Sequence, residues 1–394
     1  MRIFIVANFT NSETSRFFEL ARMFANRRHD VTVITSDFSH GAKSLKKEFP
    51  QYDNFKTIYI HEPGYKNNVS IKRLWSHYVW GRRVEKYIRN YSTKPDIVYA
   101  ALPTYTAGRL IGKWCNKNNV KYIVDVQDLW PEAFKVAIKN SFLQQAFLSM
   151  EWIANVAYKT ADYVIGVSDT YRNRALKVNN KCKEGLTIYL GNDGEKFDIA
   201  KEKYRICKPK DEFWIAYIGT MGYSYDIKLA IDAIKLVNSS KLSKKIKFVA
   251  MGNGPLLNEY RRHAEESNIK FEFTGALPYE IMVGKLCSCD AVINCLRPGA
   301  AQSITNKVGD YALCGLPVIN TQENPEYRKL VEKTQCGINC ECGNTEEVAA
   351  AIIKLVESPE LREQMGMAAK QLGQDKFDRR YSYKKIIDAV EKLV

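Results

Sequence analysis

The sequence predicts an α/β protein built from two doubly wound domains, each with a parallel sheet covered by helices on both faces. Three observations support this prediction. The chain has 394 residues, which is enough for two domains of ordinary size. Short apolar runs typical of buried strands alternate with amphipathic helical stretches in both halves of the chain. Around residues 186–212 the periodicity weakens and charges accumulate, so we expect an interdomain linker at residues 192–210.

The first domain is expected over residues 1–191. Its apolar runs predict strands at residues 1–8, 30–35, 96–100, 122–126 and 163–167. The stretches between them predict helices at residues 14–28, 106–118 and 141–159. Because the connections are helical, the strands are expected to run parallel.

The second domain is expected over residues 211–377. It repeats the pattern, with strands predicted at residues 213–218, 246–251, 270–273, 291–295 and 317–320. Helices are predicted at residues 226–239, 256–267, 346–357 and 359–372. Residues 378–394 form the last predicted helix, whose apolar side chains share one face: Tyr383, Ile386, Ile387, Val390 and Leu393.

The charge of the chain indicates an anionic partner. A net charge of +15 and a pI near 9.2 favour nucleic acid, a phosphorylated substrate or an acidic membrane surface. No apolar run is long enough to span a bilayer, and Met1–Val6 reads as a strand rather than an export signal. The ten cysteines show no extracellular framework spacing, so we expect reduced thiols in a cytoplasm.

Glycine-containing turns follow several predicted strands of the second domain. They are Ile218–Gly222, with Gly219, Thr220 and Gly222, then Met251–Pro255, with Gly252 and Gly254, and Thr274–Gly275. Such turns let a phosphate approach the backbone near a helix N-terminus, although each alone also fits a plain tight turn. Lys307 and Asp310 begin a further helix, where a cation suits a phosphate and an anion suits a sugar hydroxyl. The alternative is a surface ion pair between the two.

No metal or cofactor is expected. The chain has no Asp-x-Asp, so diphosphate would be held by Lys, Arg and backbone N–H groups. Cys336, Cys340 and Cys342 cluster, but they lack a second Cys-x-x-Cys pair and a nearby His.

Carboxylates gather in Asp125–Glu132, after a buried strand of the first domain. The segment suits hydrogen bonding to hydroxyls or the removal of a hydroxyl proton. The alternative is a solvated loop in which Asp128 caps a helix that starts at Pro131.

Basic and aromatic residues are interleaved between Lys66 and Lys94. The aromatic residues are Trp75, Tyr78, Trp80, Tyr87 and Tyr91, and the stretch holds eight cations against Glu85 alone. This composition suits an anionic membrane, which Phe142–Tyr158 would also contact, or single-stranded nucleic acid. It equally fits a solvated helix face with an aromatic core. Without a recognised binding module, no nucleic-acid partner is expected.

Motifs along nearly the whole chain resemble glycosyltransferase family 4. In the first domain they are Leu20-Ala21, His29–Val33, Asp125–Glu132, Ala161–Ile165 and Leu190–Phe197, and in the second Gly252–Pro255, Phe273–Gly275 and Lys307–Val318. The resemblance implies a GT-B fold of two Rossmann-like domains facing across a cleft, with the C-terminal helix returning to the first domain. Asp-Leu-Trp-Pro-Glu is similar to the bacterial surface-polysaccharide branch, including O-antigen and capsule fucosamine transferases.

The resemblance also implies roles for individual residues. Donor binding falls on the second domain: Gly219, Thr220, Gly222, Gly252, Gly254, Leu277, Arg297, Asn306 and Asp310. Acceptor binding falls on Gln127, Trp130 and Glu132, and catalysis on Asp128 and Lys307. Gln302 and Asp310 stand where the family has two glutamates, and Thr220 replaces an arginine, so Lys307 would supply the positive charge. Asn11–Thr14 replaces the family's glycine-rich turn, and Gln127 replaces a histidine.

These observations predict a cytoplasmic, peripherally membrane-bound retaining glycosyltransferase. It would move a sugar from a nucleotide-sugar, expected to be UDP-linked, to a polyprenyl-diphosphate-linked saccharide in surface polysaccharide synthesis. Two alternatives remain open: a sugar-nucleotide 2-epimerase of the same fold, and a non-catalytic GT-B scaffold subunit.

Overall fold

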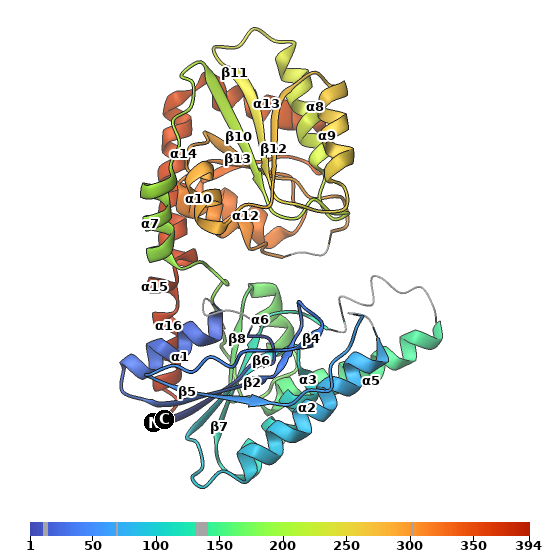
Figure 1. Cartoon of the computed structure of the whole chain (residues 1–394), viewed down its shortest axis with the longest axis vertical. Helices are drawn as coiled ribbons and strands as arrows, with labels where there is room; N and C mark the ends of the chain where they lie inside the picture. Colours follow the sequence, from blue (N-terminus) through green and yellow to red (C-terminus); the bar gives the residue numbers. More distant parts are fainter. Residues whose placement is uncertain (11–14, 68–69, 131, 133–140, 301–302) are drawn as a thin grey trace. The chain divides into compact units, whose positions relative to one another are not determined.

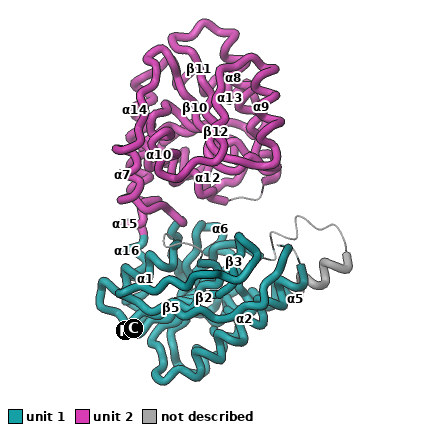
Figure 2. The backbone as a smooth tube through the Cα atoms, viewed as in Figure 1, with its two compact units in different colours: residues 1–189, 383–394 teal, residues 190–382 magenta. Residues whose placement is uncertain are grey.

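The computed structural model describes residues 1–10, 15–67, 70–130, 132, 141–300 and 303–394. The chain divides into two compact units (Figure 2). Unit 1 comprises Met1–Tyr189 and Tyr383–Val394, and unit 2 comprises Leu190–Ser382.

Unit 1 is built on a parallel sheet, as predicted. Its strand order is β5 (Lys56–Ile60), β2 (Asp30–Ser36), β1 (Arg2–Val6), β6 (Ile97–Leu102), β7 (Lys121–Val126), β8 (Tyr163–Gly166) and β9 (Leu186–Thr187). A short hairpin of β3 (Phe38–Ser39) and β4 (Ser44–Leu45) follows β2. Because the order reverses direction at β1, the switch point of this sheet lies between β1 and β6.

Helices cover both faces of the first sheet. They are α1 (Arg16–Asn26), α2 (Ile71–Arg89), α3 (Tyr105–Lys117), α5 (Ser141–Thr160) and α6 (Asp169–Leu176). Alternate residues of β1 enter different cores, because successive strand side chains point to opposite faces. Phe4 packs with Trp80 of α2 and Ile111 of α3, whereas Ile5 packs with Phe17 of α1.

The last part of the chain, Tyr383–Val394, belongs to unit 1. The single helix predicted over residues 378–394 is instead two helices: α15 (Arg379–Ser382), which lies in unit 2, and α16 (Lys384–Glu391). Ile386 and Val390 of α16 lie in the same core as α1, which confirms the expected return to the first domain. The two chain ends lie close together (Figure 1), since His29 contacts both the Met1 amino group (3.4 Å) and Glu391 (2.8 Å).

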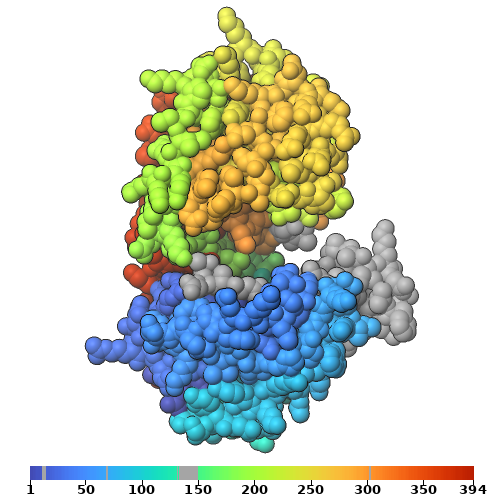
Figure 3. Space-filling view, in the orientation of Figure 1, coloured from blue at the N-terminus to red at the C-terminus, as the bar shows by residue number. Residues whose placement is uncertain are grey.

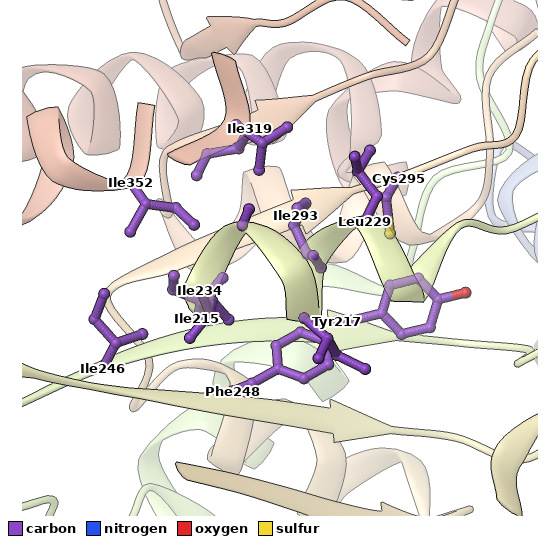
Figure 4. Packing of buried hydrophobic residues seen from close by; sticks show 14 of the residues in the cluster. Ile215, Tyr217, Leu229, Ile234, Ile246, Phe248, Ile293, Cys295, Ile319 and Ile352 are labelled. Atoms are coloured by element: carbon purple, nitrogen blue, oxygen red, sulfur yellow. The ribbon is translucent and has the colours of Figure 1, made fainter. Parts of the chain in front are cut away.

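Unit 2 repeats the doubly wound plan. Its parallel strands run in the order β12 (Lys270–Gly275), β11 (Lys245–Met251), β10 (Glu212–Ile218), β13 (Ala291–Asn294), β14 (Val318–Asn320) and β15 (Gly337–Asn339). Its helices are α7 (Gly194–Tyr204), α8 (Ile227–Asn238), α9 (Leu257–Glu266), α10 (Tyr279–Leu286), α11 (Lys307–Cys314), α12 (Pro325–Thr334), α13 (Thr345–Glu357), α14 (Pro359–Leu372), the π-helical turn η1 (Gly373–Phe377) and α15. Figure 4 shows side chains of β10, β11, β13 and β14 meeting those of α8 in one core. The switch point of this sheet lies between β10 and β13.

The stretch predicted as a linker is instead largely helical. Asp193 caps α7 by accepting a hydrogen bond from the Lys196 N–H (3.2 Å). Phe197 and Ala200 are buried against Val283 of α10, so α7 is an integral part of unit 2. The many charges of this segment lie around a narrow apolar stripe, which explains why its periodicity is weak in the sequence.

Candidate functional site

Three glycine turns meet at the carboxyl ends of β10, β11 and β12. The Gly219 N–H donates to the Met251 carbonyl (2.9 Å), and the Gly252 N–H donates to the Gly275 carbonyl (2.8 Å). All three glycines have positive φ, at +114°, +150° and +73° in chain order. The sequence predicts these turns after three separate strands. In the structure they are hydrogen-bonded to one another and lie next to the switch point between β10 and β13.

Gly252 and Gly254, both in the turn after β11, leave no room for a side chain. A Cβ atom on Gly252 would lie 1.9 Å from the Gly219 carbonyl oxygen, and one on Gly254 would lie 2.3 Å from that of Met221. At Gly222 the nearest atom would be 3.4 Å away, which is ordinary contact. The close approach at Gly252 and Gly254 therefore needs glycine, whereas Gly222 does not.

Lys307 carries a buried ammonium beside the Gly219 turn. The first helical residue of α11, it is 7% exposed, and its Nζ has no hydrogen-bond partner among the described residues. The ammonium lies 4.0 Å from the ring centroid of Tyr217 and 3.8 Å from that of Tyr225. A Cβ on Gly219 would lie 3.5 Å from the same Nζ. Burial lowers the Lys307 pKa to about 7, so an anion at this turn would stabilise the charged form.

Asp310 is engaged by other side chains. Its Oδ1 accepts hydrogen bonds from the Asn192 amide (2.6 Å) and the Tyr279 hydroxyl (2.9 Å). Burial raises the Asp310 pKa to about 7, while the Tyr279 hydrogen bond acts in the opposite direction. The ion pair with Lys307 that the sequence left open is therefore not formed.

The other predicted donor residues surround this region at varied depth. Thr220 and Asn306 are exposed, and Leu277 and Arg297 are half-buried. The backbone N–H of Arg297 donates a hydrogen bond to the Ser224 carbonyl (3.0 Å), which fixes the backbone at this position. Gln302 lies outside the described residues.

The three carboxylates of Asp125–Glu132 separate into different roles. Asp125 is buried and accepts hydrogen bonds from Arg16 (2.7 Å) and the Tyr99 hydroxyl (2.6 Å). Glu132 pairs with Arg174 of α6. Asp128 is the carboxylate of this segment that combines a partly exposed position with no cation paired to it in the described structure.

Asp128 is oriented by its own loop. Its Oδ2 accepts a hydrogen bond from the Trp130 indole N–H (3.0 Å), and its Oδ1 accepts one from the Leu129 N–H (2.9 Å). The half-buried Gln127 has an Nε2 without a partner in the described part of the chain. Pro131, which the alternative interpretation made a helix start, lies outside the described residues, as does Asn11–Thr14.

Several residues at these sites were not singled out by the sequence. Arg73 lies over the Trp130 ring at 3.8 Å, and the His77 ring is parallel to it at a centroid distance of 5.9 Å. Tyr217, Tyr225 and Tyr279 are likewise missed. Tyr217 lies in a strand pattern and Tyr225 and Tyr279 in ordinary loop or helix contexts, so tertiary proximity is the signal that identifies them.

Helices α2 and α5 expose large apolar side chains beside basic ones. Ile71, Leu74, Trp75 and Tyr78 of α2 and Trp152 of α5 are exposed, as are Lys72, Arg82, Arg83, Lys86 and Arg89. The light-blue atoms of this part of the chain lie at the surface in Figure 3. Among the described residues, no helix has the length and apolar character needed to cross a bilayer.

Comparison with known proteins assigns a family domain to each half of the chain. Residues 15–187 match the model described as Glycosyltransferase Family 4, and residues 198–372 match that described as Glycosyl transferases group 1. An uncharacterized glycosyltransferase of Methanocaldococcus jannaschii is 25% identical over 248 residues, which span 61% of this chain and 61% of that relative.

Two solved structures share the fold over the full length of this chain. HepE from Anabaena, in complex with UDP, is 16% identical with a TM-score of 0.70, and the match covers 100% of both chains. HepE has also been solved with UDP and glucose and with UDP-glucose. Sucrose-phosphate synthase from Thermosynechococcus elongatus is 15% identical with a TM-score of 0.69, covering 100% of this chain and 98% of that one. The chain thus carries a glycosyltransferase family 4 domain followed by a glycosyl transferases group 1 domain, and the two are arranged on a chain with the GT-B fold.

Proposed function

We propose that the protein is a retaining glycosyltransferase that moves a sugar from a UDP-sugar to a polyprenyl-diphosphate-linked saccharide during surface polysaccharide synthesis. It would work at the cytoplasmic face of the membrane as a peripheral protein. Unit 2 would bind the donor and unit 1 the acceptor.

The observation that carries the donor assignment is the buried ammonium of Lys307. A buried cation without a hydrogen-bond partner is costly unless an anion joins it. A Cβ atom built on Gly219 would lie 3.5 Å from the Lys307 Nζ, so the ammonium lies next to this turn. Because Gly219 has no side chain, a diphosphate can approach the backbone of the turn. Binding of UDP and UDP-glucose by HepE, a protein of the same fold, supports UDP as the nucleotide.

The chemistry proposed at this site is stabilisation of a leaving diphosphate. As the sugar–phosphate bond loosens, negative charge grows on the diphosphate, and the Lys307 ammonium and turn amides stabilise that charge. A β-phosphate oxygen of the donor would take the proton of the acceptor hydroxyl on the same face of the sugar. Asp128, held by the Trp130 indole, would orient that hydroxyl by accepting its hydrogen bond before the proton moves to the phosphate.

The surface of α2 and α5 supports a lipid-linked acceptor. Trp75, Tyr78 and Trp152 are exposed, and aromatic rings of this kind favour the boundary between headgroups and acyl chains. Basic residues on α2 add attraction to anionic lipids.

The test is diphosphate release from a panel of nucleotide-sugars, with and without a lipid-linked saccharide in detergent. We expect release from a UDP-sugar that requires the lipid acceptor, and a loss of about 100-fold or more in Lys307→Met because a charge-stabilising group is removed. Lys235→Met, an exposed lysine of α8, is the charge-matched control and should retain activity. Acceptor-independent conversion of the sugar would instead identify an epimerase, and a wild-type protein that binds no nucleotide would identify a scaffold.

A further inference from the structure

Cationic side chains gather around Tyr65 in unit 1. The Tyr65 hydroxyl is 2.5 Å from His40 Nδ1, and the Lys43 ammonium is 3.3 Å from the same nitrogen. Lys43 and Arg73 lie 5.0 and 5.3 Å from the Tyr65 ring centroid. Burial, reinforced by the charges of Lys43 and Arg73, lowers the His40 pKa to about 4. The nearby positive charges repel one another, and a bound anion would relieve this repulsion. Such clustering of cations is typical of anion-binding sites.

Aromatic groups and a buried imidazole complete this cluster. The Phe9 ring lies 4.8 Å from that of His40 and 5.6 Å from that of His77. His77 is 3% exposed, and its Nε2 has no hydrogen-bond partner among the described residues. Glu62, 3.8 Å from that nitrogen, already accepts hydrogen bonds from three neutral groups, the side chains of Asn8, Ser36 and Ser76.

The location of the cluster matches that of a ligand site. Phe9 follows β1, at the switch point of the first sheet, where ligands of doubly wound folds bind. Arg73 lies in the first turn of α2, which holds no acidic residue. Cations are unfavourable at a helix N-terminus, so a bound anion would offset both the helix dipole and the clustered charge.

An apolar cavity adjoins the cluster. It has a volume of about 140 Å³ and is lined by Leu74, His77, Tyr105, Trp130, Met150 and Ile153. Leu74 also belongs to the exposed apolar surface of α2. Trp130, which Arg73 covers at 3.8 Å, donates to Asp128, so the cluster, the cavity and the proposed catalytic carboxylate share residues.

We propose that Lys43, Arg73 and His77 form a subsite for the diphosphate of a prenyl-diphosphate acceptor, with the lipid leaving along the cavity toward α2. This inference rests on the proposed function and deepens it by naming the acceptor's anchoring group. Lys43 and Arg73 neutralise the diphosphate, and Nε2 of His77 is the buried polar atom that a phosphate oxygen or its hydroxyl would satisfy. The Arg73–Trp130 stack then couples the diphosphate to the loop that holds Asp128.

The test measures binding to the full chain by calorimetry, without sugar nucleotide, using three probes: farnesyl diphosphate, inorganic diphosphate and farnesol. Farnesyl diphosphate should bind most tightly, and Arg73→Gln and Lys43→Met should each weaken it by about 10- to 100-fold, as expected for loss of a charge-assisted hydrogen bond. Lys117→Met removes the same charge as Lys43→Met from an exposed position at the end of α3 and should leave binding within about twofold. Arg73→Lys keeps the charge and serves if Arg73→Gln does not fold.

Three binding results would overturn the subsite, and two further results separate it from the proposed function. Wild-type affinity in both Lys43→Met and Arg73→Gln would show that these side chains do not form a diphosphate subsite. Inorganic diphosphate binding as tightly as farnesyl diphosphate would show that the site does not recognise the lipid. Farnesol binding as tightly as farnesyl diphosphate would show that the diphosphate is not recognised. If transfer to a lipid acceptor proceeds although these variants bind normally, the subsite fails and the proposed function stands. If the subsite binds farnesyl diphosphate but no sugar is transferred, the proposed function fails alone.

Discussion

The ammonium of Lys307 lies 3.8 Å from the ring centroid of Tyr225 and makes no hydrogen bond to any described residue. Two aromatic faces, those of Tyr217 and Tyr225, offset part of the cost of burying this charge. They do not replace a hydrogen-bonded anion, which is why burial still lowers the Lys307 pKa to about 7. The Lys307 pKa therefore lies close to neutral pH, so small changes in pH or a bound anion change the fraction of Lys307 that is charged.

The first prediction is that UDP binding weakens as pH rises above 7. A diphosphate binds the charged ammonium, whose pKa in the free protein is about 7, so each further pH unit leaves about tenfold less of the binding-competent form. Calorimetric titration of UDP between pH 7.5 and 9.5 avoids protonation of the phosphate, whose own pKa is about 6. In Lys307→Arg the side chain stays charged throughout, so the slope should vanish. A wild-type affinity that is flat over this range would place the diphosphate elsewhere.

The second prediction concerns the contact between Gly252 and Gly219. Gly252→Ala should lower the free energy of unfolding by about 3 kcal/mol or more, since its Cβ would lie 1.9 Å from a carbonyl oxygen and its φ is +150°. Gly343→Ala is the matched control, because that residue also has positive φ but no atom within 4 Å of a Cβ. It should cost about 1–2 kcal/mol from backbone strain alone. Urea unfolding measures both, and equal losses would mean that the turns are not packed against each other.

The glycine turns and Lys307 were predictable because they follow strands, where doubly wound folds place their ligands. Their partners were not. Tyr279 and Asn192 reach Asp310 across 31 and 118 residues of chain, so no local pattern links them. Strand β5 has no clear sequence signal, because Lys56, Thr57 and Tyr59 leave no continuous run of aliphatic residues. The sequence predicts a linker where helix α7 lies, because α7 has few apolar residues and they are buried only through contact with α10.

The third prediction uses the Asp310 pKa, which burial raises to about 7. The folded state holds this proton more tightly than the unfolded chain, in which an aspartate titrates near pH 4, so ionisation of Asp310 destabilises unit 2 as pH rises from about 4 to 7. Asp310→Asn removes the titration and can still accept from the Tyr279 hydroxyl. The stability of this variant relative to wild type should therefore increase with pH up to about 7 and then level off.

Urea unfolding at pH 5, 6, 7 and 8 checks this expectation. Tyr279→Phe provides the companion variant, because its hydroxyl stabilises the ionised carboxylate. Losing it should raise the Asp310 pKa further and move the levelling point to higher pH. A difference between Asp310→Asn and wild type that does not vary with pH would show that Asp310 is ionised throughout.

The last prediction concerns Arg16, whose guanidinium joins four segments of unit 1. It donates to Asp125 (2.7 Å) and to the carbonyl of Ile188 (3.2 Å), and it lies 4.8 Å from the Tyr383 ring. Arg16→Met leaves a buried carboxylate without its cation and should lower the free energy of unfolding by about 3–5 kcal/mol. Arg22→Met, on the same helix but partly exposed and paired with Glu19, should cost less than about 1 kcal/mol.

A second substitution separates the charge of Asp125 from the packing of Arg16. In Arg16→Met with Asp125→Asn, the buried group is neutral and its amide oxygen still accepts from the Tyr99 hydroxyl (2.6 Å in the native protein). The double variant should therefore recover part of the stability that the single variant loses, because the uncompensated charge is the larger share of the cost. If the double variant is as unstable as Arg16→Met, the loss comes from the Ile188 and Tyr383 contacts, and Arg16 acts mainly by joining the C-terminal segment to α1.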